Sequence, residues 1–104
     1  MKIIPATLLL AFVLAPLTAQ AQSFNCRYAA KPDEVLICQS GELSRLDSRM
    51  SSMYFSLRNQ LGGNARYGLE VDQRNWLAGR MSCGRDYDCI ADAYHRRIRE
   101  LENY

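Results

Sequence analysis

Apolar side chains recur at steps of three and four residues through the middle of the chain, which is the pattern of one buried helix face. The stripe consists of Leu43, Leu46, Met50, Met53, Leu57 and Leu61, and Tyr54 widens it. It predicts a helix from about Glu42 to Leu61, ended by Gly62 as a C-terminal cap.

Three further segments have helical patterns. A short helix is expected from Pro32, whose missing N–H costs nothing in a first turn, to about residues 39–41. Two longer helices are expected at about 66–81 and 89–102, the second with Asp88 as its N-cap. Their inward faces carry Leu69, Gln73, Trp76, Leu77 and Arg80 in the first, and Ile90, Ala93, Tyr94, Ile98 and Leu101 in the second. No segment alternates like a strand, so the sequence predicts an all-α fold, a small disulfide-stapled bundle of one short and about three longer helices.

The first 21 residues have the plan of a secretory signal peptide. Met1 and Lys2 give a positive start, residues 3–17 are mostly apolar, and Ala19-Gln20-Ala21 forms a cleavage site. The apolar run is shorter than the roughly 20 residues of a membrane span. We therefore expect cleavage after Ala21 and a helical domain over residues 22–104, periplasmic or secreted and without a membrane span.

Composition and length argue against two classes of function for this domain. The whole chain is 48% hydrophobic, with 13 basic and 11 acidic residues, and removing Lys2 with the leader leaves 12 basic residues against 11 acidic ones. That balance is too neutral for nucleic-acid binding driven by bulk charge. A domain of this length is also small for an enzyme with a deep cleft. We expect a binding protein that needs no cofactor.

The four cysteines favour two disulfides, because export leads to an oxidising compartment. Four cysteines allow three pairings, of which the local pairs Cys26–Cys38 and Cys83–Cys89 are favoured. A zinc site does not fit, since the chain has no Cys-x2-Cys pair and only one histidine. The segment before Cys26 is too polar and bulky for a lipoprotein cleavage box, so no lipid anchor is expected there.

Candidate catalytic residues are few. His95 is the strongest base candidate at neutral pH, but it lies off the apolar face of its helix, which favours a solvated surface residue. Asp86 and Asp88 are explained more simply as loop acids, with Asp88 as a helix cap, than as the carboxylate pair of a glycosidase. We expect no catalytic residue, and a small cell-wall hydrolase is the least supported alternative.

The basic residues left after the leader are arginine at every position except Lys31. Arginine, tyrosine and tryptophan are the residue types that anchor protein interfaces, although the base composition of the genome explains the arginines equally well. A patch around Trp76 and Arg80 is one candidate surface. Asp47, at the margin of the apolar stripe, is expected to form a structural pair with an arginine of the third or fourth helix, such as Arg74 or Arg97. The alternative is a solvated residue on the helix face.

Two sets of motifs resemble the LprI-type lysozyme-inhibitor family. The first set is Phe24-x-Cys26, Pro32-x-Glu34-x-x-Ile37-Cys38 and Leu43-x-x-Leu46-Asp47 with Met50 and Tyr54. The second is Gln73-Arg74-x-Trp76-Leu77, Arg80, Cys83, Cys89, Tyr94 and Arg97-Ile98-x-x-Leu101. Together they cover essentially the whole predicted mature chain. The resemblance implies an exported bacterial protein with a disulfide-stapled helical fold that inhibits lysozyme.

Within these motifs, structural roles are expected for Pro32, Glu34, Leu46, Asp47, Arg74 and Tyr94. The chain departs from the family in two ways. Lys31 stands where the family often has Ser or Thr, so Glu34 lacks its partner in a capping box. The founding type of member is lipid-anchored and longer.

The disulfide-closed loop Gly84-Arg85-Asp86-Tyr87-Asp88 is the main candidate for binding. Lysozyme acts through two carboxylates in a groove, and a short closed loop is pre-organised, which lowers the entropic cost of binding. We expect Arg85 to reach those carboxylates and Tyr87 to pack on the rim. In the competing interpretation the bridge only fixes the turn between two helices. A further alternative is an envelope-interaction or toxin-neutralising module with no effect on lysozyme.

Overall fold

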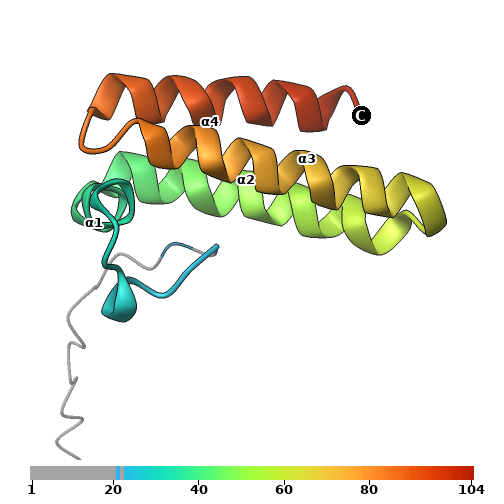
Figure 1. The fold of residues 1–104 in the computed structure, drawn as a ribbon, viewed down its shortest axis with the longest axis horizontal. Helices are drawn as coiled ribbons and strands as arrows, with labels where there is room; N and C mark the ends of the chain where they lie inside the picture. The colour runs from blue at the N-terminus through green and yellow to red at the C-terminus, as the bar shows by residue number, and fades with distance from the viewer. Residues whose placement is uncertain (1–20, 22) are drawn as a thin grey trace, which may run out of the picture.

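The described part of the chain, residue 21 and residues 23–104 of a computed structural model, is entirely helical apart from its connections. A 3-10 helix, η1 (Cys26–Tyr28), precedes α1 (Pro32–Gln39), α2 (Gly41–Gln60), α3 (Gly63–Ser82) and α4 (Tyr87–Glu102) (Figure 1). The predicted all-α class, with one short helix and three longer ones, is confirmed. The predicted signal peptide falls almost wholly outside the described residues.

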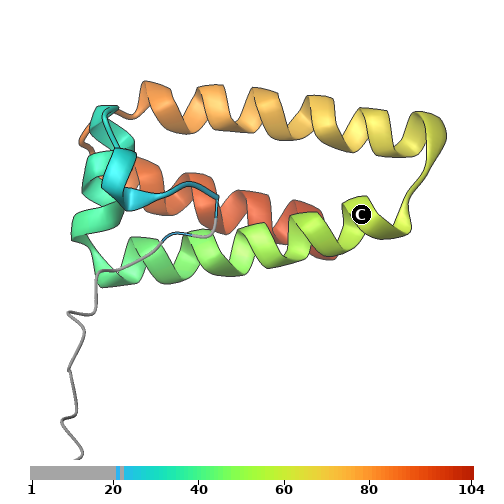
Figure 2. The ribbon, with the colours of Figure 1, turned by 90° about the horizontal axis from the view of Figure 1, so that it is seen from below.

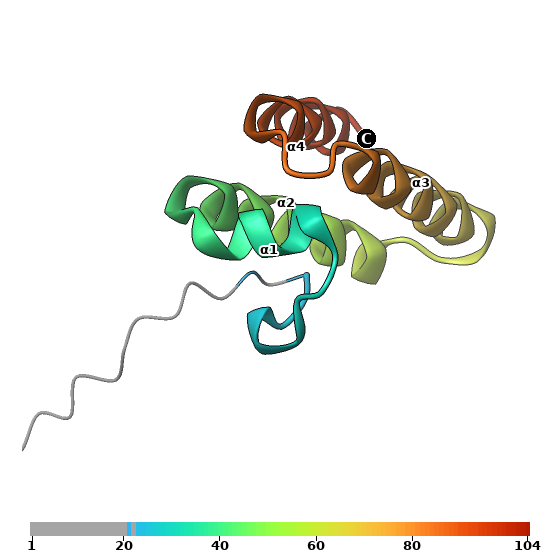
Figure 3. The same ribbon diagram turned by 60° about the vertical axis from the view of Figure 1, so that its left-hand side comes forward.

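The three long helices form a bundle in which α3 runs antiparallel to α2 and α4, and α1 closes the bundle at one end. α2 and α3 meet through the short turn at the far end, and α4 returns beside both of them (Figures 1 and 2). The most extensive helix contacts are those of α4 with α2. α1 and the segment that leads into it lie at the end where α2 begins and α3 finishes (Figure 3). Among the described residues, no helix is long and apolar enough to cross a membrane.

The predicted apolar stripe of α2 forms much of the core, but its residues are buried to different extents along the helix. Leu43, Leu46 and Met50 are buried, whereas Met53 and Leu57 are only partly buried. The reason is that α4 ends earlier than α2, as Figure 1 shows, so the later turns of α2 have less helix to pack against. The best-packed half of the molecule is therefore the half next to α1.

The faces predicted for the last two helices are also borne out. In α4 the residues that pack inward are Ile90, Ala93, Tyr94, Ile98 and Leu101, all of them buried. In α3 they are Leu69, Gln73 and Arg80, with Trp76 and Leu77 partly buried. Polar side chains thus occupy two of the three most buried positions of α3, which requires partners inside the bundle.

Two predicted helix ends are wrong. Gly62 does not cap α2: it has extended backbone (φ −136°) and precedes α3, whose first residue Gly63 takes the left-handed φ of 56° that the turn requires. The N-cap of α4 is Asp86, which accepts from the Cys89 N–H at 3.1 Å, and not Asp88. Asp88 lies in the first turn, where its charge suits the positive end of the helix dipole.

The start of α1 agrees with the sequence. Pro32 is its first residue, and Lys31, in the N-cap position, makes no side-chain cap hydrogen bond. Glu34 is partly buried and has no reciprocal partner there, so the capping box is missing. The buried residues of α1 are Asp33 and Ile37, which lie on one face because they are four residues apart.

Both predicted disulfides are present. Cys26–Cys38 ties η1 to the end of α1, and Cys83–Cys89 ties the end of α3 to the first turn of α4. No free cysteine remains in the described residues. The chain-entropy model gives about 2.9 kcal/mol of stabilisation for the first closed loop and about 2.4 kcal/mol for the second.

Candidate functional site

The disulfide-closed loop between α3 and α4 is accessible and stiff. Gly84 takes a left-handed φ of 59°, and Asp86 caps the helix that follows, so backbone geometry and the Cys83–Cys89 bridge fix both ends of the loop. Arg85 is exposed, and Tyr87, the first residue of α4, is 42% exposed. These are the two side chains that the sequence predicts as binding residues, and nothing in the described chain covers them.

Arg85 has one long contact, from its Nη2 to Gln39 Oε1 at 3.4 Å. This contact orients the guanidinium toward Gln39, the last residue of α1. Both partners are exposed, so a competing carboxylate replaces it at small cost. The loop therefore presents an oriented guanidinium whose hydrogen-bonding groups remain largely available to a partner.

The predicted patch of Trp76 and Arg80 does not exist as an open surface. Arg80 is only 5% exposed. Trp76 is half-buried, donates from Nε1 to the Ala93 carbonyl at 2.9 Å, and packs on the Tyr94 ring with centroids 5.2 Å apart. Both side chains serve the contact between α3 and α4, so a partner cannot use them without opening the bundle.

Arg80 belongs instead to a buried ion cluster of Asp33, Asp47, Arg80 and Tyr94. Its Nε donates to Asp33 Oδ2 at 2.9 Å, and its Nη1 donates to Tyr94 Oη at 3.2 Å. Tyr94 Oη in turn donates to Asp47 Oδ1 at 2.7 Å, which lies 3.6 Å from Arg80 Nη1. Four helices therefore meet at one set of polar contacts, because the members come from α1, α2, α3 and α4.

The prediction that Asp47 pairs with an arginine of the third or fourth helix is confirmed, because Arg80 belongs to α3, but the two arginines named as examples are wrong. Asp47 is fully buried and contacts Arg80 and Tyr94 in place of Arg74 or Arg97. Arg74 points to the exposed side of α3. Arg97 is buried, but it donates to Gln73 Oε1 and Glu100 Oε2, both at 3.0 Å.

Sequence analysis also missed two contributors to this cluster. Ser23 donates to Asp47 from its backbone N at 3.0 Å and from Oγ at 2.6 Å, which fixes the N-terminal segment against α2. Asp33, which is buried in α1, has no predicted role in the sequence analysis. Its spacing of four from Ile37 is the signal that places it on the inward face of α1.

The protonation states of the cluster suit a structural role. Burial raises the pKa of Tyr94 well above its ordinary value, and Asp47 raises it further while Arg80 opposes the shift. Burial would lower the pKa of Arg80, but Tyr94, Asp33 and Asp47 together raise it above its ordinary value. At neutral pH Tyr94 is a neutral donor and Arg80 is charged, so no member of this pair is poised to exchange a proton.

The remaining polar candidates stay apart. His95 is exposed on α4, and Asp86 and Asp88 are exposed at the loop. Within the described residues, no group of three His, Cys, Asp or Glu side chains lies close enough to hold a metal ion.

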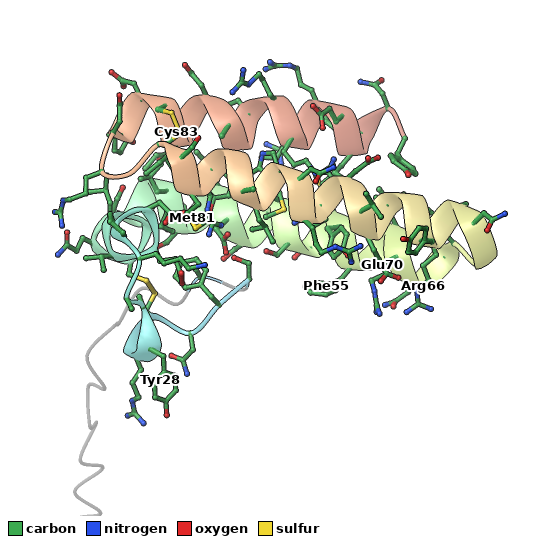
Figure 4. The ribbon with its side chains drawn as sticks, in the orientation of Figure 1. Tyr28, Phe55, Arg66, Glu70, Met81 and Cys83 are labelled. Atoms are coloured by element: carbon green, nitrogen blue, oxygen red, sulfur yellow. A yellow bond between two sulfur atoms is a disulfide. The ribbon has the colours of Figure 1, made fainter. Side chains whose placement is uncertain are left out.

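A cleft of about 510 Å³ lies between α2 and α3, under the N-terminal segment. Aromatic and aliphatic side chains form its walls, among them Phe24, Tyr54, Phe55 and Leu77. Figure 4 shows Phe55 and Glu70 on the face of α2 and α3 where the N-terminal segment also lies. The sequence patterns do not predict this cleft, because it depends on how α2, α3 and the N-terminal segment pack together.

Comparison with known proteins gives one family. The profile of the family described as Lysozyme inhibitor LprI matches residues 26–101. The proteins named Lipoprotein LprI from Mycobacterium bovis and from Mycobacterium tuberculosis are 31% identical over 83 residues, which is 77% of this chain and 41% of each relative. The chain thus spans about two fifths of the length of these curated relatives. No solved structure matches it significantly.

Proposed function

Because the chain belongs to the lysozyme inhibitor LprI family, we propose that it inhibits lysozyme by protein–protein contact after export from the cell. The match over residues 26–101 carries this proposal, since it spans both disulfides, α1 to α3 and all but the last residue of α4. Two disulfides in a domain this small are typical of oxidising compartments, which supports a periplasmic or secreted location. The leader-like first 21 residues support the same location.

The contact with lysozyme is assigned to the loop Cys83–Cys89. Lysozyme hydrolyses its substrate with two carboxylates in a groove, and an exposed arginine on a rigid loop is a matching counter-charge. Arg85 supplies that charge, and the exposed ring of Tyr87 supplies apolar area next to it. Because the disulfide holds the loop before binding, little conformational entropy is lost on contact.

The curated relatives carry the word lipoprotein in their names. In this chain the sulfur of Cys26 is bonded to Cys38, which supports a domain without a thioether-linked lipid at that position. We propose that the domain itself acts without a lipid on Cys26.

A cell-lysis assay tests the proposed function. The purified, oxidised protein is titrated into lysozyme acting on bacterial cells, and dose-dependent, saturable loss of lysis is expected. Faster lysis would reveal a hydrolase. Unchanged lysis by several lysozyme classes would contradict inhibition and leave an envelope-interaction or toxin-neutralising module.

A further inference from the structure

We propose that the cleft between α2 and α3 binds an acidic saccharide, with sugar hydroxyls at its floor, a sugar face on its aromatic wall and a carboxylate at its rim. The site is separate from the loop Cys83–Cys89, and the inference does not rest on lysozyme inhibition. Its volume of about 510 Å³ is enough for a disaccharide and lies within the ordinary range of small-molecule sites.

The floor of the cleft holds two polar atoms that need a partner. Asp33 Oδ1 and Ser51 Oγ are buried, and neither has a hydrogen bond within the described residues. Both residues line the cleft and are essentially unexposed, at 0% and 1%. Buried polar atoms without partners are rare and costly, so a ligand that donates hydrogen bonds here gains the energy that the free protein lacks.

The charge around the floor selects a neutral donor. The other oxygen of Asp33 already accepts from Arg80 Nε at 2.9 Å, so an ammonium or guanidinium beside it would meet the charge of Arg80. An anion would meet Asp33 and the nearby Asp47. A hydroxyl or amide N–H satisfies a buried carboxylate oxygen without adding charge, and its desolvation costs less than that of an ion.

The wall suits the apolar face of a sugar ring. Phe24 and Tyr54 are half-buried along the cleft, and Phe55 is 47% exposed at its edge. Figure 4 shows the Phe55 side chain projecting on this face of the bundle. Aromatic faces beside polar groups are the mixed surface that an amphipathic ring requires.

The rim is basic. Lys31 and Arg74 are exposed, line the cleft and form no ion pair within the described residues. Glu70, also at the rim, is already matched by Arg58 at 3.7 Å and Arg66 at 3.4 Å. Glu34, a partly buried carboxylate, also lines the cleft and offsets one of the two exposed positive charges. The positive charge that remains at the mouth is complementary to a carboxylate on the ligand and faces solvent, where a charged group keeps its hydration.

Two sugars that differ in a single acidic group test this assignment. The oxidised protein is titrated with N-acetylmuramic acid and, separately, with N-acetylglucosamine, and amide shifts are followed by NMR. We expect shifts at Ser51, Tyr54 and Leu77, with N-acetylmuramic acid bound about tenfold more tightly at low salt, as a charge-assisted contact provides. The difference should shrink at high salt because the rim charges are exposed. Equal affinity for the two sugars, or no shift at these residues, would overturn the proposal.

A matched pair of variants locates the site. Ser51→Ala removes a hydroxyl that has no partner, so it should leave the free energy of unfolding nearly unchanged while weakening N-acetylmuramic acid several-fold. Ser56→Ala removes a hydroxyl on the exposed side of the same helix, outside the cleft, where Ser56 Oγ accepts from the exposed Gln60 Nε2 at 3.0 Å, and it should leave binding intact. Equal effects of the two substitutions on affinity would show that Ser51 does not contact the ligand and would contradict the proposed site.

Galacturonic acid separates the sources of such a ligand. It carries a carboxylate on a ring without the lactyl ether of N-acetylmuramic acid. Comparable binding of both acids supports recognition of acidic saccharides as a class, and preference for N-acetylmuramic acid supports cell-wall glycan. Binding of neither acid contradicts the proposal.

Discussion

The buried ion cluster and the loop Cys83–Cys89 lie at the same end of the bundle but use their polar residues in opposite ways. In the cluster, Asp47 and Arg80 are almost fully buried and contact residues of other helices. In the loop, Arg85 is exposed and has a single contact at 3.4 Å. The difference shows that charge alone does not identify a binding residue: the cluster holds the helices together, and the loop is free to meet a partner.

The largest effect is expected in the cluster. Asp47→Ala leaves Tyr94 and Arg80 without one of their acceptors inside the bundle, so the free energy of unfolding should fall by about 3–5 kcal/mol. Denaturant unfolding followed by circular dichroism measures it. The control is Glu42→Ala, which breaks the exposed pair with Arg45 and should cost less than about 1 kcal/mol. Similar losses for the two variants would mean that the cluster is not a structural centre.

The loop disulfide is expected to have an intermediate effect on stability. Replacing Cys83 and Cys89 together by Ser opens a short loop, for which the chain-entropy model gives a loss of about 2.4 kcal/mol. The helices should remain, because the contacts of α3 with α4 do not depend on the bridge. Far-ultraviolet circular dichroism measures the helix content, and the unfolding midpoint measures the loss of stability. Loss of helix in the double variant at low temperature would show that the bridge does more than fix the turn.

A smaller effect is expected from alkaline pH. The folded pKa of Tyr94 is raised above its ordinary value of 10.0, so its contribution is fully present below about pH 10 and is lost as pH rises toward the folded pKa. Stability of the wild type should therefore fall more steeply above pH 10 than that of Tyr94→Phe. Parallel profiles above pH 10 would contradict a buried, neutral Tyr94.

The smallest effect on stability is expected in the loop. Arg85→Ala and Tyr87→Ala remove exposed side chains, so each should change the free energy of unfolding by less than about 0.5 kcal/mol. Chemical denaturation measures it against the wild type. A loss of 2 kcal/mol or more, on the order of a core substitution, would show that the loop side chains hold the fold.

The local part of the fold could be predicted from the sequence. The stripe from Leu43 to Leu61 fixed α2 because helical period is a local property, and the two disulfides join cysteines that are near neighbours in sequence. An arginine of the third or fourth helix could be predicted as the partner of Asp47, but the choice of Arg80 could not, because it depends on the rotation of α3 relative to α2. Arg80 was readable in part: it falls on the same predicted face as Leu69 and Gln73, and an arginine on an inward face needs buried partners.

The candidate site divides in the same way. Exposure of Arg85 and Tyr87 follows from a short closed loop between two helices, which the cysteine spacing indicates. The cleft between α2 and α3 does not follow from any local pattern, because Asp33, Ser51 and Leu77 reach it from three helices. Only the tertiary arrangement brings those side chains together.

The most direct test of the account is inhibition of lysozyme by the double variant Arg85→Ala/Tyr87→Ala. Dose-dependent inhibition of cell lysis is measured for the wild type and for this variant, with equal unfolding midpoints confirmed first. The account predicts that the variant needs at least about tenfold more protein for half-inhibition, as expected when an arginine and a tyrosine are lost from an interface centre. Unchanged inhibition by the fully folded variant would contradict the assignment of the loop as the contact with lysozyme.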